Sequence, residues 1–140
     1  GIRVPAFALW KGKIKAGERT DFPAVTSDYL PTIERLLELP ENSDRPMDGV
    51  SLVDAMRKKE TVRQKPIGFL YINRVSWMNH QYKLISTDKG KTFELHDLLA
   101  DPSEKNNIIE QHQDIYKEMK AELDAWRASL ENSNVGNDYK

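Results

Sequence analysis

The chain has 140 residues, of which 39% are hydrophobic and 31% are charged, so it is long and apolar enough to form a folded domain with its own core. Its formal net charge is -1, and no overall field favours nucleic acid or an anionic membrane. It contains no cysteine, which excludes disulfides, thiolate metal sites and a cysteine nucleophile from these residues, and no apolar run approaches the roughly 18 residues that span a bilayer.

The first predicted element is a strand at residues 2–10. Its side chains are apolar on both faces, which is typical of a strand inside a covered sheet. The chain begins with Gly1 and enters this strand-like sequence at once, so we expect a fragment or a processed chain. A strand without its covering partners should pair with a copy of itself, dock on residues 29–39 or be disordered. We favour self-association through residues 2–10.

An amphipathic helix is predicted at residues 29–39. Capping side chains precede it at residues 26–28, and Pro40 ends it. Apolar residues recur at helical spacing: Leu30, Ile33 and Leu37 form one stripe, with Tyr29 and Leu36 beside it.

A short second helix is predicted after Ser51, which can cap it, with Leu52, Ala55 and Met56 on its inner face. The polar stretch that follows has the composition of a surface linker. We therefore predict a first domain at residues 1–60, a second at residues 66–131 and a polar tail at residues 132–140.

Beyond the linker the pattern changes from helix to strand. Short segments with strand character alternate with the turn sequences Asn79-His80 and Asp88-Lys89-Gly90, which predicts an antiparallel meander of about four strands. The strands are expected at residues 67–72, 75–78, 81–87 and 91–96.

The strongest periodic signal lies in a long C-terminal helix near residues 111–130. Such a stripe either covers the sheet or recruits another chain, and we expect the first. The predicted fold is therefore α+β, with a small antiparallel meander packed by this helix. The stripe consists of Tyr116, Met119, Leu123, Trp126 and Leu130, spaced 3, 4, 3 and 4.

The sequence predicts no catalytic residue and no metal ligand. The histidines His80, His96 and His112 lack the spacing that would put two ligands on one face of an element. The carboxylates Asp97, Asp101 and Glu104 lack the spacing of a calcium loop, so we interpret Asp101-Pro102-Ser103-Glu104 as a turn with capping carboxylates.

Three stretches follow one another in the chain. The first is Gly1-Ile2-Arg3-Val4-Pro5 with Trp10-Lys11-Gly12-Lys13-Ile14. The second is Thr26-Ser27-Asp28-Tyr29-Leu30-Pro31-Thr32-Ile33, followed by Leu36-Leu37, with Asp48-Gly49-Val50-Ser51-Leu52. The third is Tyr82-Lys83-Leu84-Ile85 with Glu94-Leu95-His96-Asp97-Leu98, Asp101-Pro102-Ser103-Glu104 and Asn106-Asn107. Their order and spacing resemble those of the formylglycine-dependent sulfatases of the alkaline phosphatase superfamily. The chain departs from the family pattern at Lys11, Met78, His80 and His96.

This resemblance implies an enzyme that hydrolyses sulfate esters, periplasmic, secreted or lysosomal, in which formylglycine is the nucleophile and calcium holds the sulfate. Both would belong to an upstream catalytic domain, which is the expected partner. Residues 1–60 would be the end of that α/β domain. The implied substrate is a sulfated small molecule or glycan, and the present chain alone should be inactive.

One loop is a candidate for contact with substrate. Asn73 and Arg74 lie between two predicted strands, and an amide and a guanidinium suit sugar hydroxyls and sulfates. The alternative is an exposed loop without a ligand. For the whole chain, the alternative to a sulfatase segment is a stand-alone, non-catalytic binding domain derived from the same fold.

Overall fold

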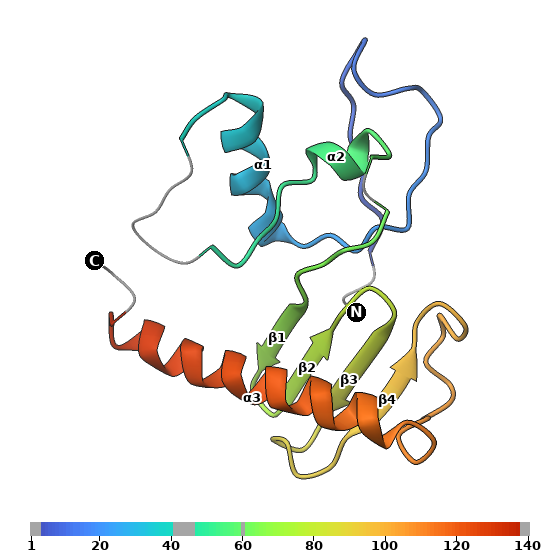
Figure 1. Ribbon diagram of the computed structural model, residues 1–140, viewed down its shortest axis with the longest axis vertical. Helices are drawn as coiled ribbons and strands as arrows, with labels where there is room; N and C mark the ends of the chain where they lie inside the picture. The colour runs from blue at the N-terminus through green and yellow to red at the C-terminus, as the bar shows by residue number, and fades with distance from the viewer. Residues whose placement is uncertain (1–3, 41–46, 60, 138–140) are drawn as a thin grey trace. The chain divides into compact units, whose positions relative to one another are not determined.

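A computed structural model describes residues 4–40, 47–59 and 61–137 (Figure 1). The chain divides into two compact units. Unit 1 comprises Gly1–Glu41 and Met47–Val62, and unit 2 comprises Asn42–Pro46 and Arg63–Lys140. No helix in the described residues is both long and apolar enough to cross a membrane.

Unit 1 is built from short helices and irregular chain. The helices are η1 (Thr26–Asp28), α1 (Tyr29–Leu36) and α2 (Val53–Met56). Helix α1 ends three residues before the predicted limit, because Glu38 adopts a left-handed backbone with φ 54°. Helix α2 follows Ser51 as predicted, but its N-cap residue is Leu52 and no side-chain cap forms. The Ser51 hydroxyl accepts only a long hydrogen bond of 3.4 Å from the Val53 amide.

The predicted first strand is wrong for the described residues. Residues 4–10 contain no strand, and Phe7 and Leu9 are each 96% exposed. Residues 2 and 3 lie outside the described part. A strand needs a hydrogen-bonding neighbour, and the described residues of unit 1 form no sheet that could supply one. Among the described residues, Val4, Phe7 and Leu9 therefore remain exposed, while Trp10 lies under the guanidinium of Arg57.

The apolar stripe of α1 is not buried within this chain. Leu30, Ile33 and Leu37 are 43%, 51% and 63% exposed. The buried residues at this helix are instead polar, Asp28 and Thr32. The apolar residues that unit 1 does bury among its described residues are few: Phe22, Val53 and Ala55.

Unit 2 contains the predicted antiparallel meander. A single sheet has the order β1-β2-β3-β4, so each strand pairs with its neighbour in sequence. The register places Trp77 opposite Gly68 on one side and Leu84 on the other. The strands are β1 (Ile67–Tyr71), β2 (Arg74–Met78), β3 (Tyr82–Ser86) and β4 (Glu94–Asp97).

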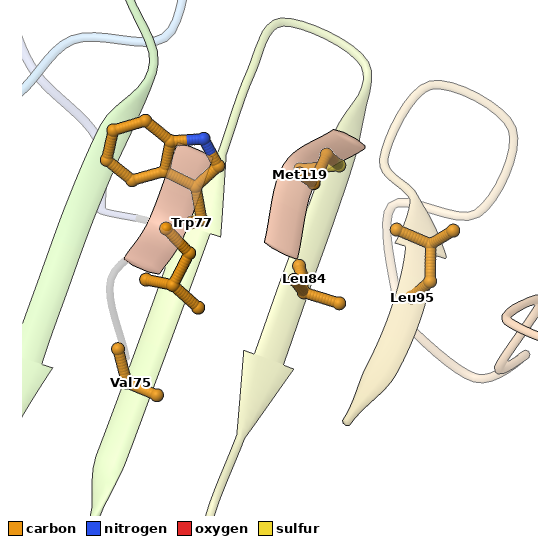
Figure 2. Close-up of a cluster of buried hydrophobic side chains, with 6 residues drawn as sticks. Val75, Trp77, Leu84, Leu95 and Met119 are labelled. Atoms are coloured by element: carbon orange, nitrogen blue, oxygen red, sulfur yellow. The ribbon is translucent and has the colours of Figure 1, made fainter. Parts of the chain in front are cut away.

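Helix α3 (Gln113–Asn134) crosses one face of this sheet (Figure 1). Met119 and Leu123 are buried, with Tyr116 and Trp126 half-buried beside them, which confirms that the predicted stripe covers the sheet. Gly68 is required here, because a Cβ would lie 2.5 Å from the ring of Trp126. The buried core consists of Val75, Trp77, Leu84, Leu95, Met119 and Leu123 (Figure 2).

The boundaries of the elements in unit 2 differ from those expected, most of all at β4 and at the end of α3. Strand β4 begins at Glu94, because the preceding residues form the turn organised by Asp88. Helix α3 continues to Asn134, so the first residues of the predicted polar tail are helical. Trp126, in the C-terminal half of this helix, adds to the core by contacting Trp77 at 5.6 Å between ring centroids.

Candidate functional site

The predicted substrate residues Asn73 and Arg74 lie in the hairpin that joins β1 and β2. Tyr71 and Arg74 are cross-strand partners, so Ile72 and Asn73 form the turn between them. Ile72 has φ 54°, a left-handed conformation that is costly for a β-branched residue. The hairpin tip is therefore a strained, well-defined feature.

The structure separates the roles of the two candidates. Arg74 is exposed at the start of β2, and within the described residues its guanidinium has no ion-pair or hydrogen-bond partner. Asn73 contributes through its backbone, since its carbonyl oxygen accepts a hydrogen bond of 2.8 Å from the Lys89 amide. That bond ties the hairpin to the turn between β3 and β4.

Asp88 organises this second turn. Its carboxylate accepts hydrogen bonds from the amides of Lys91 and Thr92, both at 3.0 Å, and from the Thr92 and Ser86 hydroxyls. The Thr92 amide is the main cause of the lowered pKa of Asp88, and the two hydroxyls add to it. The turn is thus held by an ionised carboxylate rather than by apolar packing.

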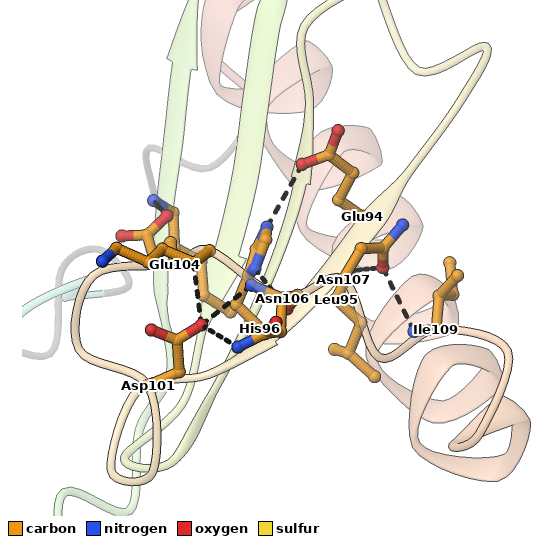
Figure 3. Close-up of polar contacts among 10 residues, drawn as sticks. Glu94, Leu95, His96, Asp101, Glu104, Asn106, Asn107 and Ile109 are labelled. Atoms are coloured by element: carbon orange, nitrogen blue, oxygen red, sulfur yellow. Dashed lines mark hydrogen bonds and ion pairs between the residues drawn. The ribbon is translucent and has the colours of Figure 1, made fainter.

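A buried polar network lies on β3, β4 and the loop after them (Figure 3). The ammonium of Lys83 is within 2.5 Å of a Glu104 oxygen, and only 7% of the Lys83 side chain is exposed. His96 Nδ1 donates to the Asn106 carbonyl at 2.9 Å, while Nε2 lies 3.2 Å from Glu94. Burial of Lys83 and His96 without polar partners would be costly, so their bonds to Glu104 and to the Asn106 carbonyl hold the loop in place.

Asparagine and aspartate side chains complete this loop. Asp101 accepts from the amides of Asn106 and Lys105 at 2.8 and 2.7 Å, and these bonds, led by that of Asn106, lower its pKa. Asn107 accepts from the Leu95 amide at 3.0 Å, which covers the outer edge of β4. This confirms the interpretation of Asp101 as a capping group in the turn, whereas the same interpretation is wrong for Glu104, whose carboxylate pairs with Lys83.

A second polar cluster organises unit 1, around the buried Asp28. Its carboxylate accepts hydrogen bonds of 2.8 Å from the amides of Val25 and Val50. The Thr32 hydroxyl donates to the Asp28 carbonyl at 2.6 Å and accepts from the Leu52 amide at 2.9 Å. We call this arrangement the Asp28 clamp, because it fastens the chain before α2 to the start of α1.

Gly49 completes the Asp28 clamp. A Cβ at this position would lie 2.0 Å from the Ser27 carbonyl oxygen, so any side chain would push the two segments apart. The polar residues shared with the sulfatase pattern here therefore position backbone. We expected Asp28 to cap the helix, and no side-chain cap forms at that helix; its partner 22 residues away could not be found from local spacing.

The Lys83–Glu104 pair was also missed from the sequence. Lys83 alternates with apolar residues in a strand, which gave no sign that its ammonium would be buried. The available signal was that Lys83 and Glu104 both belong to the third sulfatase-like stretch.

The comparisons with known proteins bear on the whole chain. Residues 1–129 match the family model described as "N-sulphoglucosamine sulphohydrolase, C-terminal". The chain belongs to this sulfatase family. Steryl-sulfatase from Homo sapiens is 33% identical over 81 residues, which cover 55% of this chain and 14% of that protein. N-acetylgalactosamine-6-O-sulfatase from Bacteroides thetaiotaomicron is 25% identical over 140 residues, covering 89% of this chain and 27% of that protein.

Solved structures agree on the fold of this sulfatase chain. Ps i-CgsB matches with a TM-score of 0.74 and 22% identity, over 84% of this chain and 27% of that chain. The protein BT4656, solved with its substrate D-glucosamine-2-N,6-O-disulfate, matches with a TM-score of 0.57 and 20% identity, over 75% of this chain and 24% of that chain. The sulfatase chain therefore spans about a quarter or less of the relatives that it matches.

The calcium ion implied by the resemblance has no matching donor set in the described residues. No group of three or more histidine, aspartate or glutamate side chains in residues 4–40, 47–59 and 61–137 is arranged to hold a metal. The carboxylates that come closest in sequence are already used, Asp97 and Asp101 by backbone amides and Glu104 by Lys83. We assign no metal ligand to these residues.

Proposed function

We propose that this chain is the C-terminal part of an enzyme that hydrolyses sulfate esters, with the nucleophile and metal site in an upstream domain. In this proposal unit 1 completes the upstream α/β domain, and unit 2 is the smaller C-terminal subdomain that borders the substrate. The observation that carries the proposal is the exposed apolar surface of unit 1.

That surface has two parts. The extended segment at residues 4–10 exposes Val4, Phe7 and Leu9, and helix α1 exposes Leu30 and Ile33. Burying one such side chain contributes about 1.5–3 kcal/mol. A soluble protein rarely leaves this much apolar surface exposed. A segment of a larger domain does expose such surface when the rest of that domain is absent.

The Asp28 clamp supports the same role. It holds α1 and α2 together through buried hydrogen bonds, so the outer side of α1 is free to pack elsewhere. Polar groups inside and apolar groups outside is the arrangement expected of a layer that packs against a larger core.

The finer part of the proposal concerns Asn73 and Arg74. Arg74 presents an unpaired guanidinium at an exposed hairpin, which suits the oxygens of a sulfate or of a sugar. Asn73 positions that hairpin through its carbonyl bond to Lys89. Calcium and formylglycine remain with the upstream domain in this proposal.

The test compares the isolated 140-residue chain with the same chain joined to its upstream sequence. The joined protein should hydrolyse 4-nitrophenyl sulfate and the isolated chain should not. In the joined protein, Phe7→Lys should lower the melting temperature, since it places a charge in the proposed interface. The isolated chain should self-associate, as measured by sedimentation velocity, and Phe7→Lys should reduce that association.

The matched control is Lys13→Ala, a change of an exposed side chain in the same segment, which should leave melting temperature and association unchanged. Turnover by the purified isolated chain would contradict the proposal. If the Phe7→Lys variant of the joined protein melts at the wild-type temperature, the segment is not an interface, and the stand-alone binding domain is favoured.

A further inference from the structure

We propose that Tyr71 and Arg74 together form a binding platform for a sulfated sugar unit of a glycan substrate. The inference rests on the proposed sulfatase function and extends it, because Tyr71 is added as a determinant of specificity and the substrate class is named. The platform lies on the face of the unit 2 sheet that α3 does not cover.

The strand register puts these two side chains next to each other. Val75 and Trp77 belong to the core that packs under α3, so the alternate residue Arg74 points to the other face. Tyr71 is the cross-strand partner of Arg74 and shares that face. Tyr71 is 71% exposed, and Arg74 is exposed as well.

Both side chains are available for a ligand. Within the described residues neither has an ion pair, a hydrogen bond from its side chain or a ring contact. Of the nearby carboxylates, Asp88 is engaged by Ser86 and Thr92, and Glu94 faces His96. No competing acid therefore neutralises the Arg74 guanidinium from within its own hairpin.

The backbone beneath the platform is fixed. The left-handed Ile72 forces a tight turn, and the bond from the Lys89 amide to the Asn73 carbonyl links that turn to the next one. Behind Tyr71 on the same face, Phe69 is half-buried opposite the buried Ser76. A rigid support lowers the entropy that ligand binding must overcome.

The chemistry of the pair selects the ligand. A guanidinium presents paired N–H donors to two oxygens of a sulfate group. A tyrosine ring offers a flat apolar surface with a polar tip, which fits the C–H face of a sugar and an adjacent hydroxyl. A small aryl sulfate can use the sulfate contacts of the active site alone, whereas a glycan would gain the added contact with the hairpin.

The experiment uses the complete enzyme that contains this chain. Steady-state kinetics are measured with 4-nitrophenyl sulfate and with a panel of sulfated disaccharides from chondroitin, heparin and carrageenan. Arg74→Ala and Tyr71→Ala should each raise KM for the best disaccharide about three- to tenfold, with a smaller rise for the aryl sulfate. Arg74→Lys should recover part of the loss, and Tyr71→Phe most of it.

Lys117→Ala, at an exposed position on α3, is the matched control and should leave both KM values unchanged. Melting temperatures should agree among all variants, because the substituted side chains are exposed. Equal KM values for the disaccharide in wild type, Arg74→Ala and Tyr71→Ala would overturn the inference alone, as would turnover of the aryl sulfate but of no disaccharide. Hydrolysis of neither substrate would overturn the proposed function and this inference with it.

Discussion

The two units of this chain bury opposite kinds of side chain. Unit 2 buries its apolar residues between a four-stranded sheet and α3, and its polar groups pin the loops at the sheet edge. Unit 1 buries polar groups in the Asp28 clamp and exposes the apolar faces of α1 and of residues 4–10. The first pattern is typical of a self-sufficient subdomain, and the second is the one that we expect if unit 1 is part of a larger layer.

This difference has a simple source in chain connectivity. In unit 2 every strand pairs with its sequence neighbour, and the covering helix follows directly, so all partners are contained in one stretch. The first segment of unit 1 has strand-like sequence without a partner strand in the described residues. Local contacts can be satisfied by a short chain, whereas long-range sheet contacts cannot.

The largest expected effect contrasts one leucine in each unit. Leu123→Ala should lower the free energy of unfolding of unit 2 by about 2–5 kcal/mol, because it leaves a cavity at a fully buried position. Leu37→Ala, on the exposed side of unit 1, should change it by less than about 0.5 kcal/mol in the isolated chain. Urea unfolding followed by tryptophan fluorescence measures both. Equal losses of unfolding free energy in the two variants would contradict the proposed difference between the units.

An intermediate effect is expected at the Asp28 clamp. Asp28→Ala removes the acceptor of the Val25 and Val50 amides, each worth about 1–3 kcal/mol when left buried and unsatisfied. Hydrogen exchange should accelerate at Val50 and remain unchanged at Leu84 in unit 2. The exposed Asp48→Ala is the control. Acceleration at Leu84 as large as at Val50 would mean that the units unfold together.

The smallest effect concerns acid. Hydrogen bonds lower the pKa of Asp88, Asp97 and Asp101 in unit 2 below the ordinary value of 3.8, led by the amides of Thr92, Ala100 and Asn106 respectively. A lowered folded-state pKa contributes stability that is present above pH 3.8 and is lost as the pH falls through the folded-state values. The melting temperature should therefore decline as the pH drops below about 4.

Asp88→Asn should make that decline shallower, since one of the titrating groups is gone. Asp21→Asn, an exposed change in unit 1, should leave the slope as in wild type. An Asp88→Asn variant with the wild-type slope would show that the turn between β3 and β4 opens before Asp88 is protonated.

Most of unit 2 could be predicted because its signals are local. Turn residues separate the strands, and the spacing of Tyr116, Met119 and Leu123 identifies the covering helix. The candidate residues Asn73 and Arg74 were found as a polar pair between strands. That Arg74 faces away from α3 beside Tyr71 required the register, because a shift of one residue would reverse every side chain.

The apolar character of residues 2–10 and of α1 was readable in the sequence by itself, as were the meander, the long helix and the likeness to sulfatases. Only the tertiary structure shows which way those apolar faces point, because a hydrophobic pattern indicates that a face should be buried without identifying the element that buries it. The same holds for Asp28 and Lys83, whose partners Val50 and Glu104 lie about twenty residues away. Periodicity describes one helix or strand at a time, whereas the burial of a side chain and the pairing of two residues depend on which distant segments the fold brings together.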